Sequence, residues 1–298
     1  MKTHHMHNAA KQRILKPQLV LGIIWMIACA RPAFGQLDFE AAPINYNSME
    51  TTDPVRKLME RIDAGDFELK YDSNHGYLPA MLEALDVSPS SQMLVFSKTS
   101  FQLRKINPAR PRAVYFNDDV YIGWVQKGDV LEISSVDPQN GAIFYTLSQE
   151  ETDRPKIVRD KGQCITCHAS SRTSGVPGHL VRSVYASSSG QPFFGSGTFT
   201  TDHRSPFHER WGGWYVTGTH GKQRHMGNVI ASDRDEPEEL DVESGANVVD
   251  LSNRIDTAPY LRPTSDIVAL MVLEHQARMH NLITRANFDT RSAQHYDK

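Results

Sequence analysis

The sequence has 298 residues, of which 39% are hydrophobic and 22% are charged, so the chain is long enough to bury a large core. This balance excludes an intrinsically disordered chain and a collagen-like repeat. Lys and Arg total 32 against 35 for Asp and Glu, which leaves no basic excess to bind nucleic acid. Three cysteines are too few for a disulfide-based scaffold.

Residues 1–35 have the pattern of a secretory signal peptide. Four basic residues precede an apolar run over 19–30, and Ala33 and Gly35 are small residues suited to cleavage before Gln36. The run is shorter than the roughly 20 residues of a membrane-spanning helix, so we expect no integral span. Lipoprotein processing at Cys29, or retention of the run as an anchor, are the alternatives. Each route places the protein in the periplasm or another extracytoplasmic space.

The mature chain is predicted to have an α+β fold. Residues 36–91 form an N-terminal helical segment, because apolar residues recur three and four apart over 53–62 and 77–85. In residues 92–231 the period changes to two, which predicts a β-rich core with strands over 93–96, 113–116, 120–125, 130–134 and 142–147. Turn sequences between these runs predict an antiparallel meander. A second β group is expected over 180–186, 193–201, 213–219 and 228–231.

The end of the chain is predicted to hold a linker and a helix. Residues 232–262 form an acidic linker, since 232–245 contain seven acids and one Arg. Residues 263–298 form a C-terminal helix and tail, with the helix over 265–288 and Thr264 or Ser265 as its N-cap. An apolar stripe is expected to face the core through positions 268, 271, 272, 275, 279, 282, 283 and 286, and it includes His275 and Met279.

Residues 164–168 read Cys-Ile-Thr-Cys-His, which is the C-x-x-C-H pattern of c-type haem attachment. This spacing suits the chemistry, because the two thiols add to the two vinyl groups of one porphyrin and the adjacent imidazole ligates the iron. Such attachment takes place outside the cytoplasm, in agreement with the predicted export. The motif therefore predicts one covalent haem c held by Cys164, Cys167 and His168.

In this motif the sequence resembles the c-type cytochromes, specifically exported bacterial proteins with one haem per chain. The resemblance implies thioether bonds at Cys164 and Cys167 and an axial iron ligand at His168. The motif lies mid-chain between β-rich segments, so we do not expect the small all-α cytochrome c fold. A zinc site and a redox dithiol are the alternatives for the same residues.

Other residues are candidates for completing a haem site. Arg172 and Arg182 flank the loop after the motif and are predicted to pair with the haem propionates. Four candidates for the sixth iron ligand are His220, His225, Met226 and His275. The first three follow an aromatic segment, and His275 belongs to the predicted buried stripe. A ligand from this set predicts a six-coordinate, low-spin iron.

The leading functional hypothesis is electron transfer by this haem. Removal of residues 1–35 leaves 27 basic against 35 acidic residues, a net charge of about −8, which favours a basic redox partner and not nucleic acid. The first alternative is a haem enzyme or a gas or redox sensor with an open distal site. The second is a non-haem export protein that uses its dithiol or binds a metal.

Overall fold

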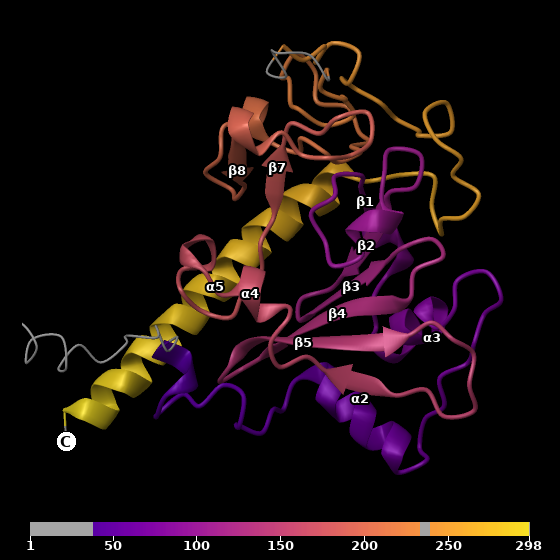
Figure 1. Cartoon of the computed structure of the whole chain (residues 1–298). Helices are drawn as coiled ribbons and strands as arrows, with labels where there is room; N and C mark the ends of the chain where they lie inside the picture. Colours follow the sequence, from indigo (N-terminus) through magenta and orange to yellow (C-terminus); the bar gives the residue numbers. More distant parts are fainter. Residues whose placement is uncertain (1–37, 233–238, 298) are drawn as a thin grey trace, which may run out of the picture.

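The computed structural model describes residues 38–232 and 239–297, so the predicted signal peptide and Cys29 lie outside the described residues. The chain forms a six-stranded sheet, a second sheet of two strands, and a long C-terminal helix that runs alongside the larger sheet (Figure 1). This architecture confirms the predicted α+β class and excludes a small all-α fold. None of the helices in the described part combines the length and apolar character needed to cross a membrane.

Most helices and strands of the structure lie where the sequence patterns predict them. The α-helices in the described residues are α2 (Pro54–Asp63), α3 (Leu78–Ala84), α4 (Ile165–His168) and α5 (Ile267–Tyr296). The strands of the larger sheet are β1 (Met93–Val95), β2 (Arg112–Phe116), β3 (Val120–Trp124), β4 (Val130–Asp137), β5 (Gly141–Ser148) and β6 (Ile157–Arg159). The smaller sheet pairs β7 (Arg182–Val184) with β8 (Thr198–Thr200).

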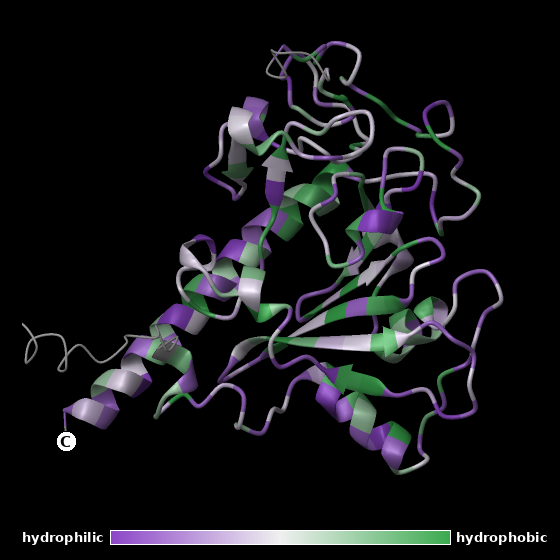
Figure 2. Ribbon diagram, in the orientation of Figure 1, coloured by the Kyte–Doolittle hydropathy of each residue, from purple (hydrophilic) through white to green (hydrophobic). Residues whose placement is uncertain are grey.

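The larger sheet is the predicted antiparallel meander, in which β1 to β6 are neighbours in chain order. Only β6, a three-residue strand, was not predicted. One face carries Ile133 opposite Tyr145, and the Tyr145 hydroxyl donates to the Asp53 carboxylate at 2.6 Å. Asp53 also caps α2 by accepting from the Val55 amide at 3.0 Å. This face therefore packs against α2, a helix that combines hydrophobic and hydrophilic residues (Figure 2).

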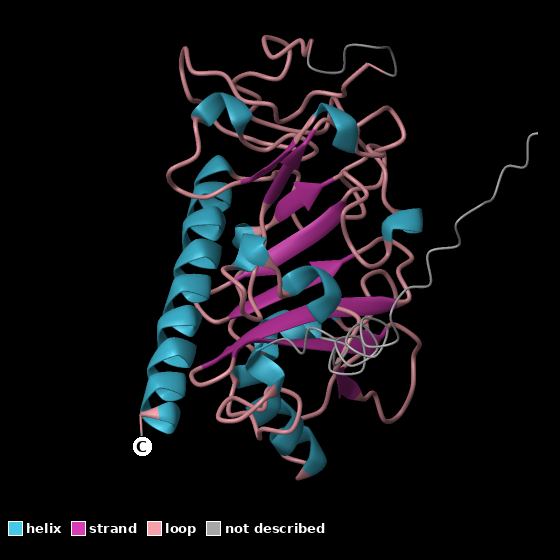
Figure 3. Cartoon of the chain, turned by 60° about the vertical axis from the view of Figure 1, so that its left-hand side comes forward, coloured by secondary structure: helices cyan, strands magenta, loops and turns pink. Residues whose placement is uncertain are grey.

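The opposite face turns towards α5, because neighbouring side chains of a strand point to opposite sides of a sheet. Its central row runs across four strands, and each member is in register with the next: Phe116, Tyr121, Ser134 and Phe144. Gln276 of α5 donates to the Tyr121 hydroxyl at 2.8 Å. Figure 3 shows α5 as the long helix that ends at the C-terminus beside the sheet.

The predicted strands over 213–219 and 228–231 are wrong, because both segments are loops. Positive φ angles at Trp211 (66°), Gly213 (83°) and Asn228 (64°) turn the backbone away from an extended course. The aromatic segment still contacts the edge of the sheet, where the Tyr215 amide donates to the Leu94 carbonyl at 2.8 Å. The segment therefore forms one isolated β-bridge to β1, between Trp214 and Val95, and not a strand.

The predicted acidic linker also differs from the structure. Residues 233–238 lie outside the described part, but Leu251, Ile255 and Tyr260 are buried in the main core. The Tyr260 hydroxyl donates to the Pro111 carbonyl at 2.9 Å. Part of the predicted linker therefore packs into the core, and the acidic composition of the preceding segment gave no sign of this.

Candidate functional site

The predicted attachment motif forms one isolated helical turn, α4. The Asp160 carboxylate accepts a hydrogen bond from the Cys164 amide at 2.9 Å, and the His168 amide donates to the Cys164 carbonyl at 3.0 Å. This turn, with Cys164 at its N-terminal end, holds Cys164, Cys167 and His168 within five consecutive residues. Cys164 is half-buried, Cys167 is exposed, and both are free thiols.

The ring of His168 is held in one orientation by the loop that follows α4. Its Nδ1 lies 2.9 Å from the Gly178 carbonyl oxygen, while the Gly178 amide donates to the His168 carbonyl at 2.8 Å. The imidazole packs on Phe144 of β5 with ring centroids 4.8 Å apart. Because a carbonyl can only accept, Nδ1 carries the proton, and Nε2 has no hydrogen-bond partner among the described residues. A neutral ring in this tautomer is suited to bind a metal through Nε2.

The surroundings of His168 and Cys164 favour the neutral imidazole and the protonated thiol, respectively. Burial lowers the pKa of His168, and the nearby Arg112 adds to that effect against the opposing Gly178 hydrogen bond. Burial and the Asp160 carboxylate raise the pKa of the Cys164 thiol to about 12. The Cys164 side chain is therefore a protonated thiol at neutral pH, and not a ready thiolate.

Two histidines that the sequence analysis did not select lie near His168. His179 Nε2 is 2.8 Å from the Ser134 hydroxyl, and its ring packs on Tyr121 at 4.2 Å between centroids. His280 Nδ1 is 3.0 Å from the Tyr121 hydroxyl. His168, His179 and His280 thus follow the same cross-strand row on the α5 face. Burial and then the neighbouring His280 and His168 hold the pKa of His179 well below its ordinary value.

The two predicted propionate partners lie near Cys167. Arg182 donates from Nη2 to the Thr198 hydroxyl at 2.8 Å, and its guanidinium lies 5.1 Å from the centroid of the Phe194 ring. Burial and the neighbouring Arg172 lower the pKa of Arg182, whereas the Cys167 thiol opposes this shift. The charges of Arg172 and Cys167 thus both act on Arg182.

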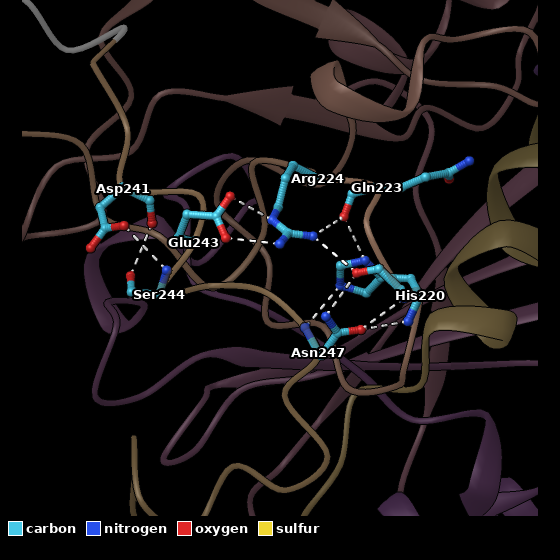
Figure 4. A network of polar contacts seen from close by, with 8 residues as sticks. His220, Gln223, Arg224, Asp241, Glu243, Ser244 and Asn247 are labelled. Carbon is cyan, nitrogen blue, oxygen red and sulfur yellow. Dashed lines mark hydrogen bonds and ion pairs between the residues drawn. The ribbon is translucent and has the colours of Figure 1, made fainter.

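His220, a predicted iron ligand, instead closes a loop (Figure 4). Its Nδ1 lies 2.8 Å from the Gln223 carbonyl oxygen, and its Nε2 accepts from the Asn247 amide at 2.9 Å. The Asn247 side chain in turn accepts from the His220 amide at 2.7 Å. Both ring nitrogens are thus occupied, so iron ligation by His220 requires this loop to open.

His225 and Met226 are buried in contacts of their own. The His225 ring is 2% exposed, packs on Trp211 with centroids 5.1 Å apart, and accepts from the Gly227 amide through Nδ1 at 3.0 Å. Burial, then His220 and Arg224, lower the pKa of His225 to about 3. The Met226 sulfur accepts from the Ser183 hydroxyl at 3.6 Å.

The prediction that His275 and Met279 face the core is wrong. Both are exposed on the outer face of α5, where His275 Nδ1 lies 3.1 Å from His203 Nδ1. The inner face instead carries polar groups with individual partners. Glu274 forms a buried ion pair with Arg210, and the Asn281 amide donates to the His179 carbonyl at 2.8 Å. The same face also buries apolar residues at positions other than the predicted stripe, namely Ile267, Leu270, Leu273, Ala277 and Phe288.

Comparisons with protein-family models, with curated proteins and with solved structures each find no match to this chain. Among the described residues, no three His, Cys, Asp or Glu side chains are grouped so as to hold a metal ion. What the geometry offers is two free thiols and one oriented imidazole on a single turn, with two arginines beside them.

Proposed function

We propose that the chain is an exported protein with one haem c, bound through thioethers at Cys164 and Cys167 and ligated by His168, and that it transfers electrons. The observation that carries this proposal is the 2.9 Å contact between His168 Nδ1 and the Gly178 carbonyl oxygen. It leaves the Nε2 lone pair free in a fixed ring, which is the arrangement that metal-ligating histidines adopt.

The donor set fits covalent attachment. Each thiol S–H adds across one vinyl double bond, so sulfur bonds to one carbon, hydrogen to the other, and nothing leaves. This step requires reduced cysteines, and both thiols are free. Arg172 and Arg182 then supply guanidinium groups for the propionates. When bound, the haem supplies a one-electron iron couple.

The alternative of a redox dithiol is less well supported. Catalytic C-x-x-C pairs depend on a cysteine whose thiol pKa is lowered, because the thiolate is the nucleophile. Here burial and Asp160 raise the pKa of the Cys164 thiol to about 12. The electrostatics of α4 therefore oppose thiolate formation at this position.

A haem enzyme or sensor with an open distal site is the second candidate. The observation in its favour is that the proposed sixth ligands are engaged elsewhere, most clearly His220 through both ring nitrogens. Iron without a sixth protein ligand can bind small molecules at the free position.

Absorption spectra of the oxidised and reduced protein, recorded with and without carbon monoxide, distinguish these functions. A six-coordinate electron carrier gives a low-spin spectrum that carbon monoxide leaves unchanged. An open distal site gives a spectrum that carbon monoxide shifts. The absence of any haem band in protein made with haem c maturation contradicts both candidates.

The partner expected for electron transfer is basic. The mature chain has a net charge of about −8, and opposite charges steer transient encounters between redox proteins. Exchange rates with a basic electron donor should fall as ionic strength rises, because salt screens the attraction. A rate that rises with salt contradicts a basic partner.

A further inference from the structure

A cavity of about 220 Å³ lies beside the proposed haem site without including the motif itself. It is bounded by the loop after α4, the end of β8 and the inner face of α5. Its lining includes Arg172, Thr200, Asp202, Arg278 and His179. This volume lies below the roughly 300–1,000 Å³ of pockets for drug-sized ligands, so the cavity suits a small anion.

The cavity carries an excess of positive charge. Three arginines and one carboxylate, Asp202, contribute to its wall. Arg204 forms an ion pair with Asp202, donating two hydrogen bonds to its carboxylate at 2.7 and 3.1 Å. The guanidinium of Arg172 has no ion-pair or hydrogen-bond partner within the described residues. Arg278 forms an ion pair with Asp202, with Nε 3.8 Å from Oδ2, and donates from Nη1 to the Ser174 hydroxyl at 2.9 Å. The three guanidinium groups of the wall therefore share one carboxylate, which leaves the cavity with a net positive charge.

His179 provides an independent indication that this cavity holds a ligand. Its side chain is 7% exposed, and Ser134 engages Nε2 at 2.8 Å. The other ring nitrogen, Nδ1, is buried without a hydrogen-bond partner in the described part of the chain. Arg278 Nε is also buried without a hydrogen bond, although it lies in ion-pair range of Asp202. Leaving such buried groups unpaired costs free energy, which a bound hydrogen-bonding group recovers.

We propose that this cavity binds a small oxyanion or carboxylate group between Arg172 and Arg278. Guanidinium groups bind such anions through paired, charge-assisted hydrogen bonds. His179 donates from Nδ1 when the Ser134 hydroxyl donates to Nε2, so the anion selects one tautomer. The walls of the site are formed without the attachment motif, because none of them comes from residues 164–168. Its occupant is either a free anion or a propionate of that haem.

Calorimetric titration with inorganic phosphate, nitrite and acetate at constant ionic strength tests the site. The titrated protein is the haem-free Cys164→Ser/Cys167→Ser variant; if that variant does not fold, the wild-type chain produced without haem replaces it. We expect saturable binding of one anion per chain. Arg278→Gln should weaken it at least tenfold, and Arg172→Gln should weaken it as well. The matched control is Arg285→Gln, because Arg285 lies on the same helix and pairs with Asp289 outside the cavity.

Repeating the titration on haem-loaded protein identifies the source of the anion. Binding that persists assigns the site to a free anion, and binding that disappears assigns it to a propionate. The absence of saturable binding to the haem-free chain overturns the proposal, as does equal affinity in Arg278→Gln and Arg285→Gln. Failure of haem attachment leaves the haem-free experiment unaffected, so the two proposals fail separately.

Discussion

The Nδ1 atom of His168 lies 2.9 Å from the carbonyl oxygen of Gly178, and the Gly178 amide returns a hydrogen bond to the His168 carbonyl at 2.8 Å. The next residue, His179, is held through its own backbone by both ends of the Asn281 amide. The orientation of the motif histidine therefore depends on a side chain from α5, far away in the sequence.

Replacing Gly178 by Ala should disturb this link. A Cβ at this position would lie 2.1 Å from Asn281 Oδ1, an atom that accepts from the His179 amide at 2.8 Å. Because Asn281 is buried and bonded at both ends, we expect a loss of about 1–3 kcal/mol in the free energy of unfolding. Urea denaturation measures this loss. Gly162→Ala, where a Cβ meets nothing within 4 Å, is the control, and equal stability of the two variants contradicts the account.

The two faces of α5 should respond differently to truncation. Leu273 is 4% exposed on the inner face, whereas its neighbour Val272 is 45% exposed on the outer face. We expect Leu273→Ala to cost about 2–5 kcal/mol and Val272→Ala to cost less than about 1 kcal/mol. Thermal or chemical denaturation compares them. Similar losses of stability in both variants would contradict the buried face of α5 in the structure and favour the apolar stripe predicted from the sequence.

The wrong face of α5 was predicted to be buried for a physical reason. Hydrophobic periodicity identifies the face of a helix with the most apolar residues, but α5 buries Glu274, Asn281 and Thr284. Each of these has a partner supplied by the tertiary structure, such as Arg210 for Glu274. Such pairing leaves no periodic signal, so the sequence predicted the existence of α5 correctly and its orientation incorrectly.

The same distinction holds for the rest of the molecule. The meander was predictable because its strands alternate and are separated by short turns, and each strand pairs with its neighbour along the chain. The motif was predictable because its three residues are adjacent. The row of His168, His179 and His280 was not, since it requires α5 to pack on Tyr121, more than 100 residues away. The one sequence signal for this row was that His179 follows the motif by only a few residues.

Acid should destabilise the protein through its buried histidines. Burial lowers the pKa of His225 from an ordinary value of about 6.5 to about 3, so the unfolded chain binds a proton in this range that the folded chain does not. The stability from this group is complete above pH 6.5 and is lost as pH falls towards 3. At pH 5 the loss is about 2 kcal/mol.

His225→Asn should reduce this acid sensitivity. Asn has an oxygen acceptor for the Gly227 amide and does not titrate. Unfolding free energies of the two proteins should therefore converge as pH falls from 7 to 5. Parallel pH profiles would contradict the account, because they would show that the pKa of His225 is the same in the folded and unfolded chain.

Single substitutions of the proposed sixth ligands should not alter the haem spectrum. His220 is engaged at both ring nitrogens, and the Met226 sulfur accepts from the Ser183 hydroxyl, so both side chains already have other partners. We expect His220→Ala and Met226→Leu to retain the spin state of the wild-type protein, measured by visible absorption. Conversion to high spin in either variant contradicts this expectation and identifies the replaced residue as the sixth iron ligand.

The central claim is that Cys164 and Cys167 attach a haem covalently. The measurement that tests it most directly is the mass of the denatured chain, produced with its export signal and haem c maturation. We predict the mass of the mature chain plus one haem, and the mature chain alone for Cys164→Ala/Cys167→Ala, because only thioethers survive unfolding. A denatured wild-type chain without added haem contradicts the claim.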